Sequence, residues 1–283
     1  MGLNLTQKII KNHTKGNIVP KTGEEAAIII DQCLTQDSTG TMAWLEFESL
    51  GLKKVKVKTA VSYIDNTNLG FKGESSEDHL FLQTIASHFG AVFSKPSNGV
   101  CHQIHYERFA KPGETLLGSD SHTPTSGALS MLAIGAGGMY VAVALAGGPF
   151  HLNMPIVVDI NLKEKLNWGS SAKDIILEIL KKIKVTGGKG KILEYSGPGI
   201  KTLSIPQRAT ICNMGAETGA TTSIFPSDII TKQFLLKQKR IKDYKNLGAD
   251  KNAKYDQIIN IDLSKIIPLV AMPGSPDNVK TIN

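Results

Sequence analysis

The chain has little cysteine: three residues in 283, with no Cys-x-x-Cys pair among them. Such a count excludes a disulfide-stapled secreted scaffold and a compact zinc motif, and it fits a reducing, cytoplasmic location. We interpret Cys33, Cys101 and Cys212 as small buried apolar residues, so this chain offers no ligand set for a metal. The first residues also lack the long apolar stretch of a signal peptide.

Nucleic-acid signatures are missing as well, although the formal net charge is +7. No RRM, KH or zinc-finger pattern is present, and the lysines are spread along the chain. We therefore predict a basic, solvated surface that attracts small polyanions, with no nucleic-acid partner. Residues 127–150 carry no charge, but their many glycines favour a buried helix and turn over a membrane span, so we predict no membrane partner.

The composition that is present is globular, with 41% hydrophobic residues and 27 glycines. The length suits one large domain or two of ordinary size. Alternating or continuous apolar runs predict strands, and apolar residues at helical spacing predict helices. The predicted strands are 24–33, 55–63, 100–106, 115–118, 156–162 and 192–195, and the predicted helices are 78–89 and 171–183, with a loop at 34–40.

This alternation of strands and helices predicts an α/β protein with layered α/β/α domains. The pattern changes at Pro155, so we expect a first domain over 1–154 and a second over 155–283. Near the start of the second domain, Ser171 and Asp174 have the spacing of a helix capping box.

The C-terminal part is more polar. Residues 232–256 are rich in lysine and predict a surface helix and loop. Residues 273–278 contain two prolines and a glycine, a composition typical of a linker. We therefore expect this chain to be one piece of something longer.

The densest polar cluster is Gly-Ser-Asp-Ser-His-Thr at 118–123, between an apolar strand and an apolar segment. Neighbouring Asp, Ser and His suggest a hydrolase triad, but consecutive side chains point in different directions and no G-x-S-x-G elbow is present. A strand-to-helix turn exposes backbone N–H groups that bind anions, and a simple capped helix start explains the same residues. Other polar clusters lie at 98–103, where a buried histidine at a strand end is the simple alternative, and at 213–217 and 36–37.

Taken together, these clusters resemble the aconitase superfamily of iron–sulfur hydro-lyases. The matching segments occur in family order almost from end to end of the chain, which makes the joint signal specific. Within the family the pattern is similar to bacterial aconitate hydratases rather than to isopropylmalate dehydratases. The segments are DQCLTQDSTG (31–40), SYID (62–65), GVCHQ (99–103), GSDSHTPT (118–125), VTGG (185–188), EY (194–195) and ATICNMGAE (209–217).

The resemblance implies three α/β domains around a cluster and a mobile fourth domain, of which this chain contains about the first two. It implies dehydration and rehydration of citrate and isocitrate through cis-aconitate, with a 4Fe-4S cluster whose iron acts as a Lewis acid. The family's cluster ligands lie in Gly-Ser-Cys-Thr-Asn and Cys-x-x-Cys motifs of the third domain, which this sequence does not contain. The expected partners are a tricarboxylate substrate and a complementary chain carrying the cluster and swivel domains.

The resemblance also assigns catalytic roles to five residues. Asp65 matches the aspartate of an Asp-His pair that protonates the departing hydroxyl. His102 and Asp120 match a hydrogen-bonded pair at the active site, and His122 and Glu217 match a second His/Glu pair. A carboxylate behind an imidazole fixes its tautomer and raises its basicity, which suits proton delivery. We therefore predict that each of the two pairs lies within hydrogen-bond reach.

Three further residues match substrate-contacting positions of the family: Gln36, Ser121, which contacts a substrate carboxylate, and Asn213, which lies near the cluster. The sequence departs from the family at Asn66, because a histidine usually follows the aspartate at this point. An asparagine does not transfer a proton near neutral pH, so this departure weakens the predicted acid role of Asp65.

Several functions remain open at this stage. The first is an aconitate hydratase-type enzyme that is inactive without a cluster-bearing half. A second is a truncated, non-catalytic remnant or carboxylate-binding module, which Asn66 and the missing cysteine motifs favour. Isopropylmalate or homoaconitate dehydratase activity is a further alternative. RNA binding, which some aconitases show, is disfavoured by the missing domains.

Overall fold

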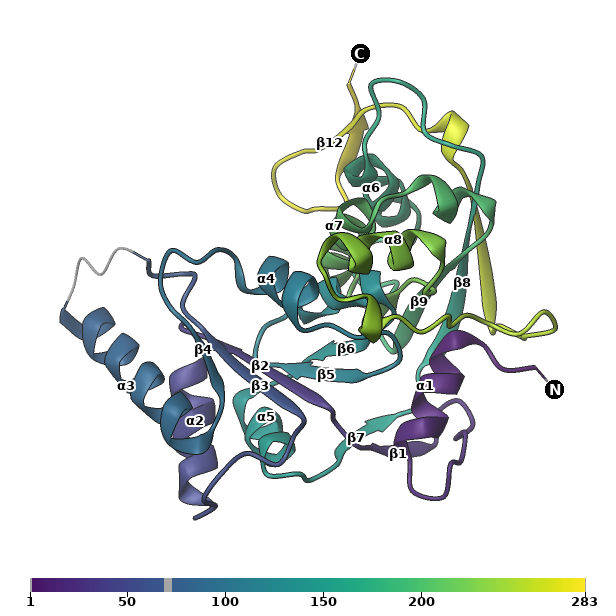
Figure 1. The fold of residues 1–283 in the computed structure, drawn as a ribbon. Helices are drawn as coiled ribbons and strands as arrows, with labels where there is room; N and C mark the ends of the chain where they lie inside the picture. The colour runs from purple at the N-terminus through teal and green to yellow at the C-terminus, as the bar shows by residue number, and fades with distance from the viewer. Residues whose placement is uncertain (1, 69–72, 283) are drawn as a thin grey trace.

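Two parallel β-sheets organise the chain, one of five strands and one of four, and helices cover both (Figure 1). The computed structural model describes residues 2–68 and 73–282. This architecture confirms the predicted α/β class with layered α/β/α units. The five-stranded sheet uses strands before Pro155 and the four-stranded sheet uses strands after it. The domain boundary itself stays a prediction.

The first sheet has the strand order β4-β3-β2-β5-β6, with all neighbours parallel. Going outward from β2, the chain adds β3 and β4 on one side and then returns to add β5 and β6 on the other. The strand order therefore reverses between β2 and β5, which makes a topological switch point there. The bounds are β2 (Gln32–Gln36), β3 (Thr59–Tyr63), β4 (Val92–Ser94), β5 (Thr115–Gly118) and β6 (Leu132–Gly135).

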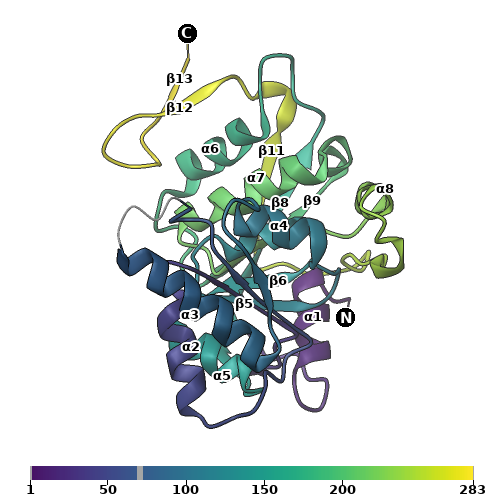
Figure 2. The same cartoon turned by 60° about the vertical axis from the view of Figure 1, so that its left-hand side comes forward.

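Period-two alternation explains how this sheet is buried on both faces. In β2, Cys33 belongs to the core under one layer of helices and Leu34 to the core under the other. One face is covered by α2 (Gly40–Ser49), α3 (Gly73–Phe89) and α5 (Gly138–Leu145), which lie together in Figure 2. The opposite face is covered by α4 (Cys101–Arg108) and the 3-10 helix η1 (Thr123–Leu129).

The second sheet has the order β10-β9-β8-β11 and is also entirely parallel. Its strands are β8 (Ile156–Lys163), β9 (Lys191–Ser196), β10 (Thr222–Ile224) and β11 (Gln257–Asp262), and its helices include α6 (Ala172–Ile183) and α7 (Ile205–Gly215). The capping box predicted at the start of α6 is confirmed: the Asp174 carboxylate accepts from the Ser171 backbone N–H at 2.7 Å.

The N-terminal helix α1 (Leu5–His13) crosses over to the second sheet. Glu194 of β9 is 2% exposed, and its carboxylate accepts the backbone N–H groups of Leu5 and Thr6, each at 2.9 Å. The Tyr255 hydroxyl donates to the same carboxylate at 2.7 Å. A strand residue thus satisfies the unpaired N–H groups at the start of a helix that is far away in sequence.

The two sheets meet where η1 packs against α7 and β10. The Phe225 N–H donates to the Gly127 carbonyl at 2.9 Å, and the Ser130 hydroxyl donates to the Phe225 carbonyl at 2.6 Å. A Cβ on Gly127 would lie 1.8 Å from the Ser223 carbonyl oxygen, so only glycine permits this approach. Buried residues of both sheets share the two large apolar clusters, so the two cores are continuous.

The remaining elements are short. The strands β1 (Glu25–Ile28) and β7 (Phe150–Asn153) pair antiparallel. The predicted surface helix near the C-terminus is α8 (Ile229–Lys237), followed by the 3-10 helix η4 (Ile241–Asp243). The predicted linker at 273–278 is instead the connection of an antiparallel hairpin, β12 (Leu269–Ala271) and β13 (Val279–Thr281), which packs on α6. The shorter 3-10 turns are η2 (Pro198–Thr202), η3 (Ala216–Thr218) and η5 (Leu263–Lys265).

Three further predictions of secondary structure were wrong. The single strand predicted over 24–33 is two strands, β1 and β2, which belong to different sheets. Residues 100–106 form most of helix α4 rather than a strand, so His102 sits in a first helical turn and not at a strand end. The loop predicted at 34–40 begins later, because β2 continues to Gln36. The charge-free segment 127–150 contains the predicted helix, α5, together with strand β6. Across 2–68 and 73–282, no helix is long and apolar enough to cross a membrane.

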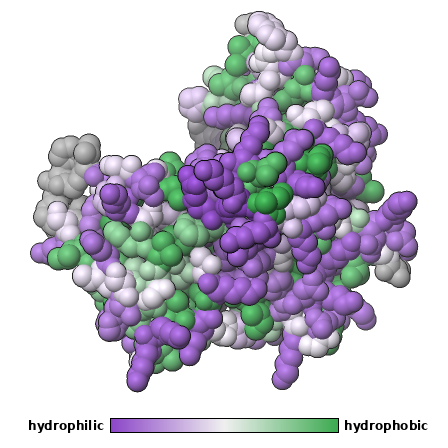
Figure 3. Space-filling model, viewed as in Figure 1, coloured by the Kyte–Doolittle hydropathy of each residue, from purple (hydrophilic) through white to green (hydrophobic). Residues whose placement is uncertain are grey.

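The face of the molecule seen in Figure 3 is largely hydrophilic. Hydrophilic side chains cover most of the right-hand part of the face in Figure 3, over α1 and the second sheet. Apolar side chains form smaller patches on the left and on the upper part of that face. Helices α2 and α5 expose five large apolar side chains. These are Met42, Leu45, Met139, Tyr140 and Val143.

Candidate active site

Polar residues from three neighbouring strands of the first sheet gather at one edge. Gln36 ends β2, Asp65 follows β3 and Asp120 follows β5. Because these strands are parallel, their carboxyl ends lie together, and β2 and β5 flank the switch point. Ligands of open α/β sheets bind at such a place.

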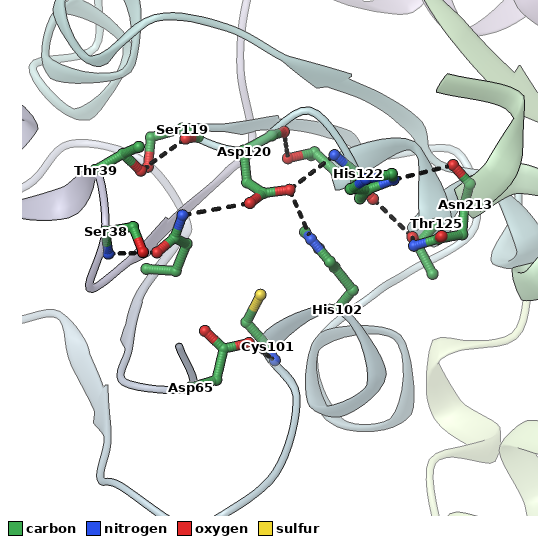
Figure 4. Close-up of polar contacts among 12 residues, drawn as sticks. Ser38, Thr39, Asp65, Cys101, His102, Ser119, Asp120, His122, Thr125 and Asn213 are labelled. Carbon is green, nitrogen blue, oxygen red and sulfur yellow. Dashed lines mark hydrogen bonds and ion pairs between the residues drawn. The ribbon is translucent and has the colours of Figure 1, made fainter. Parts of the chain in front are cut away.

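His102 and Asp120 form the predicted pair, with 2.9 Å between His102 Nε2 and Asp120 Oδ1 (Figure 4). The His122 backbone N–H donates to the same carboxylate oxygen at 2.7 Å, and Gln36 Nε2 donates to Asp120 Oδ2 at 3.3 Å. Burial raises the pKa of the Asp120 carboxyl, but the hydrogen bonds from His102 and His122 outweigh burial and lower this pKa to about 2. Asp120 is therefore ionised near neutral pH and accepts a hydrogen from His102 Nε2.

Glycines let the turn that carries Asp120 fold tightly. A Cβ on Gly135 of β6 would lie 2.5 Å from the Asp120 carbonyl oxygen, and a Cβ on Gly118 would lie 2.2 Å from Thr123 Oγ1. The Thr123 hydroxyl donates to the Asp120 carbonyl at 2.6 Å. The segment between β5 and η1 is thus held against the edge of the sheet, with the Asp120 side chain over the switch point.

Helix α4, which carries His102, is bound at both ends by charged groups from other elements. The Asp65 carboxylate accepts the Cys101 backbone N–H at 2.7 Å, at the start of the helix. At the other end, the buried Arg240 guanidinium donates to the carbonyls of Glu107 at 2.9 Å and Ala110 at 2.6 Å. An anion at a helix N-terminus and a cation at its C-terminus both stabilise the helix dipole. These two contacts hold His102 in place.

His122 connects the two sheets. Its Nδ1 lies 3.2 Å from the carbonyl oxygen of Asn213, in the last turn of α7. A carbonyl only accepts, so Nδ1 carries the hydrogen and Nε2 is free in the neutral ring. Glu217 Oε1 lies 3.8 Å from that Nε2, an ion-pair distance longer than a hydrogen bond. The His102–Asp120 geometry is therefore as predicted, whereas the second pair is close without a hydrogen bond.

The remaining predicted substrate contacts also lie at this junction. The Asn213 side-chain amide donates to Thr125 Oγ1 at 3.0 Å, and the Asn213 backbone carbonyl accepts from His122. Ser121 is exposed and lines a cavity of about 420 Å³ between the sheets, next to Gly135. The ring centres of His102 and His122 are 6.4 Å apart, so one small molecule can reach both. The structure thus brings all eight predicted residues to one region, and their catalytic and binding roles remain predictions.

Asp37 is a site residue that sequence reasoning left without a role. Its carboxylate accepts the backbone N–H groups of Asp65 and Asn66, each at 3.0 Å, and of Thr67 at 2.8 Å. Burial raises the pKa of Asp37, but these bonds and one from the Thr67 hydroxyl lower the pKa by more than burial raises it. The pKa of Asp37 therefore lies below the usual value. The sequence pattern that indicates this role is the position of Asp37 directly after β2, because an aspartate in a turn often accepts backbone N–H groups.

The structure offers no iron–sulfur site among the residues that it describes, where no group of three His, Cys, Asp or Glu side chains is placed to hold a metal ion. Cys33, Cys101 and Cys212 are free and buried, as predicted. Burial raises the pKa of each thiol, which disfavours the thiolate form that binds iron. The cluster expected for the family therefore does not fit the residues that the structure describes.

Comparison with known proteins finds relatives that are named as hydratases and dehydratases. A probable mitochondrial aconitate hydratase of Dictyostelium discoideum is 39% identical over 297 residues, covering 97% of this chain and 38% of that protein. The mitochondrial homocitrate dehydratase of Saccharomyces cerevisiae is 40% identical over 267 residues, or 87% of this chain and 34% of that protein. The 3-isopropylmalate dehydratase large subunit 1 of Thermotoga maritima is 35% identical over 283 residues, or 100% of this chain and 67% of that subunit.

The chain thus spans about a third of the length of the first two relatives. The sequence model described as the aconitase family (aconitate hydratase) matches residues 7–283, nearly the whole chain. This match confirms the resemblance that the motifs indicated. The fold, the strand-edge cluster and the family match agree, and this chain belongs to the aconitase family.

Proposed function

We propose that this chain supplies the proton-handling part of an aconitate hydratase-type site, which interconverts citrate and isocitrate through cis-aconitate. The observation that carries the proposal is the His102–Asp120 pair, 2.9 Å apart at the switch point and beside His122. An imidazole backed by a carboxylate, with a second imidazole beside it that lies 3.8 Å from Glu217, is suited to exchange protons with a hydroxyl group. Two of the relatives described above are named as dehydratases, which supports the same reaction class.

The chain's own groups account for proton movement at two atoms. His102 donates through Nε2 to ionised Asp120, so a proton enters or leaves at Nδ1. His122 donates through Nδ1 to the Asn213 carbonyl, so its exchangeable nitrogen is Nε2, which faces Glu217. In both cases the carboxylate stabilises the imidazolium that forms when the ring takes up a proton.

The substrate class in this proposal is a tricarboxylate. The exposed Ser121 hydroxyl is available to a substrate carboxylate, and the chain's positive charge attracts polyanions. The relatives include proteins named for homocitrate and for 3-isopropylmalate, so a homoaconitate-type or isopropylmalate-type substrate is the nearest alternative.

The cluster and the remaining catalytic groups must come from residues outside this chain. We propose a complementary chain carrying the cluster and swivel domains as the partner, since no metal-binding group is found among residues 2–68 and 73–282. The same observation favours a second candidate, a carboxylate-binding module that performs no chemistry. Asn66, which stands where the family usually has histidine, also favours it.

Citrate titration of the chain labelled with ¹⁵N-histidine tests the site. We expect saturable shifts of the ring signals of His102 and His122, while those of His88 and His151 stay in place. His102→Asn should weaken citrate binding about tenfold, the size expected for one charge-assisted hydrogen bond. Unmoved His102 and His122 signals, or equal shifts of all four histidines, would contradict the proposal.

Formation of cis-aconitate from citrate then separates enzyme from module. The assay is run after the cluster-bearing polypeptide of the same source is added. If the chain is part of an enzyme, we expect absorbance from aconitate that requires both chains and is lost in Asp120→Asn. The module predicts citrate binding with no aconitate at any ratio of the two chains.

A further inference from the structure

We propose that Asp65 and Asn66 act in this chain as positioning residues for the His102–Asp120 pair. The functional meaning of this proposal rests on the proposed function, because it takes that pair to be the reacting one. The geometric claim is independent of any activity: hydrogen bonds lead from Asn66 to Cys101 on one side and to the imidazole of His102 on the other, and the peptide bond from Cys101 to His102 closes the ring.

One side of the ring runs through Asp65 to the helix that carries His102. Both carboxylate oxygens of Asp65 are engaged: Oδ2 accepts the Cys101 N–H at 2.7 Å, and Oδ1 accepts Asn66 Nδ2 at 3.1 Å. Cys101 is the first residue of α4 and directly precedes His102. A carboxylate that accepts an N–H group at the start of a helix anchors that end of the helix, and here it fixes the residue directly before His102.

The other side runs through Gln36 to Asp120. Asn66 Nδ2 donates to Gln36 Oε1 at 2.8 Å, and the Ser38 backbone N–H donates to the same oxygen. With two donors on its oxygen, the Gln36 amide must turn its nitrogen toward Asp120, which it reaches at 3.3 Å. If the amide were reversed, its oxygen would face a carboxylate and its nitrogen would face two donors.

The residue type at position 66 fits this role. An amide nitrogen carries two hydrogens, and Asn66 gives one each to Asp65 and Gln36. A neutral imidazole carries one hydrogen on one nitrogen and cannot make both bonds from a single atom. Asp37 holds the backbone of the same loop through the N–H groups of Asp65 and Asn66, so the amide is presented from a fixed base. Asn66 therefore links Gln36 and Asp65 by two hydrogen bonds, whereas a histidine at this position would transfer a proton.

Nuclear magnetic resonance of the 283-residue chain tests the ring without any activity. The readouts are hydrogen exchange of the Gln36 side-chain amide, hydrogen exchange of the Cys101 backbone amide and the ¹⁵N signals of the His102 ring. The variant is Asn66→Ala, which removes both donors. Asn98→Ala is the matched control, because Asn98 is an exposed loop asparagine that donates to Ser94 outside the ring.

In Asn66→Ala we expect exchange at Gln36 to rise about three- to tenfold, with a second set of His102 ring signals in a chain that still unfolds cooperatively. Asn66→His keeps one donor and should disturb Gln36 or Cys101 but not both. Asn98→Ala should leave all three readouts as in the parent chain.

The proposal is overturned if Asn66→Ala leaves Gln36 and His102 unchanged, or if Asn98→Ala changes them equally. Asp65→Ala offers an independent check, because the anchor role predicts faster exchange at Cys101 there. Failure of the citrate titration with these readouts behaving as expected would remove the proposed function and leave the ring in place.

Discussion

Both large sheets are entirely parallel, but they contribute different elements to the junction between them. The first sheet presents the carboxyl ends of β2, β3 and β5, with Gln36, Asp65 and Asp120 at their tips. The second presents the end of α7 and the turn before β10, with Asn213 and Glu217. His102 and His122 lie between the two contributions, so the candidate site belongs to the junction and to neither sheet alone.

We call the four-stranded sheet and its helices the second region. Its buried charged groups have structural partners. Arg208 is fully buried and donates to the Asp228 carboxylate at 2.7 Å and to the Ile200 carbonyl at 2.8 Å. Glu194 binds the start of α1. In the candidate site, by contrast, His102 contacts Asp120 through Nε2 and His122 contacts the Asn213 carbonyl through Nδ1, so each ring keeps its other nitrogen for proton exchange. Buried charge alone therefore does not identify a functional group.

The largest expected effect is on the stability of the second region. Arg208→Met should lower the free energy of unfolding by roughly 3 to 5 kcal/mol, because it leaves the Asp228 carboxylate without its partner. Urea unfolding measures this loss, with the exposed Lys201→Met as the control. A loss below about 1 kcal/mol would show that Arg208 does not support the fold as its contacts indicate.

A smaller and pH-dependent effect is expected at the other end of the first sheet. The Asp31 carboxylate lies 2.8 Å from His13 Nε2 and 2.9 Å from Lys58 Nζ. Burial raises the pKa of Asp31, but these bonds outweigh burial and lower it to about 2. Burial lowers the pKa of His13, but the hydrogen bonds of its ring to Asp31 and to the Ile9 carbonyl outweigh burial and raise it. Asp31→Asn should cost about 2 kcal/mol of unfolding free energy.

The sign of the pH dependence follows from the two shifts. A lowered carboxyl pKa stabilises the fold above its unfolded value and is lost as pH falls toward 2. A raised histidine pKa stabilises the fold below 6.5 and is lost as pH rises through the folded value. The cost of Asp31→Asn should therefore be larger near about pH 5.5 than near about pH 8.5. Equal costs at the two pH values would mean that the His13 contact contributes nothing.

A still smaller stability effect is expected in the site itself. His102→Asn removes one hydrogen bond to Asp120 and should cost about 1 kcal/mol of unfolding free energy. Its citrate binding should nevertheless weaken about tenfold, since the exchangeable ring nitrogen is gone. A stability loss as large as that of Arg208→Met, with citrate binding retained, would reverse the contrast between the two regions.

The smallest effect is expected at a surface ion pair of the second region. Lys182 and Glu178 lie one helical turn apart on α6 with 3.4 Å between charged atoms, and both are partly exposed. Lys182→Ala should change the free energy of unfolding by about 0.3 kcal/mol and should not alter citrate binding. A change above about 1 kcal/mol would indicate that surface charge matters more in this region than its exposure suggests.

Strands and long helices were predictable because their signals are local. The alternation in 156–162 marks β8, and the spacing in 78–89 marks most of α3. Helix α4 was predicted as a strand because its eight residues carry apolar and polar groups without a clear helical face. Its ends are bound by Asp65 and Arg240, which lie far away in sequence, so no local pattern reports them.

The candidate site was predictable as a set of residues through family motifs, and less so as a set of contacts. The pairing of His102 with Asp120 follows from the motifs and is confirmed. The link from Asn66 to Gln36 and the binding of the loop by Asp37 were not anticipated. A motif preserves residue types at positions, whereas an asparagine that replaces a histidine makes bonds that depend on its new surroundings.

The sequence by itself determined the α/β class, the capping box at Ser171 and the family, because periodicity, capping and motif order act over short stretches of chain. Only the tertiary structure decided that residues 101–108 are helical, that His122 reaches the Asn213 carbonyl and that Gly127 lies against the Ser223 backbone. These features join segments distant in sequence. Their free energy comes from contacts that exist only once both sheets have formed, and local propensity carries no record of them.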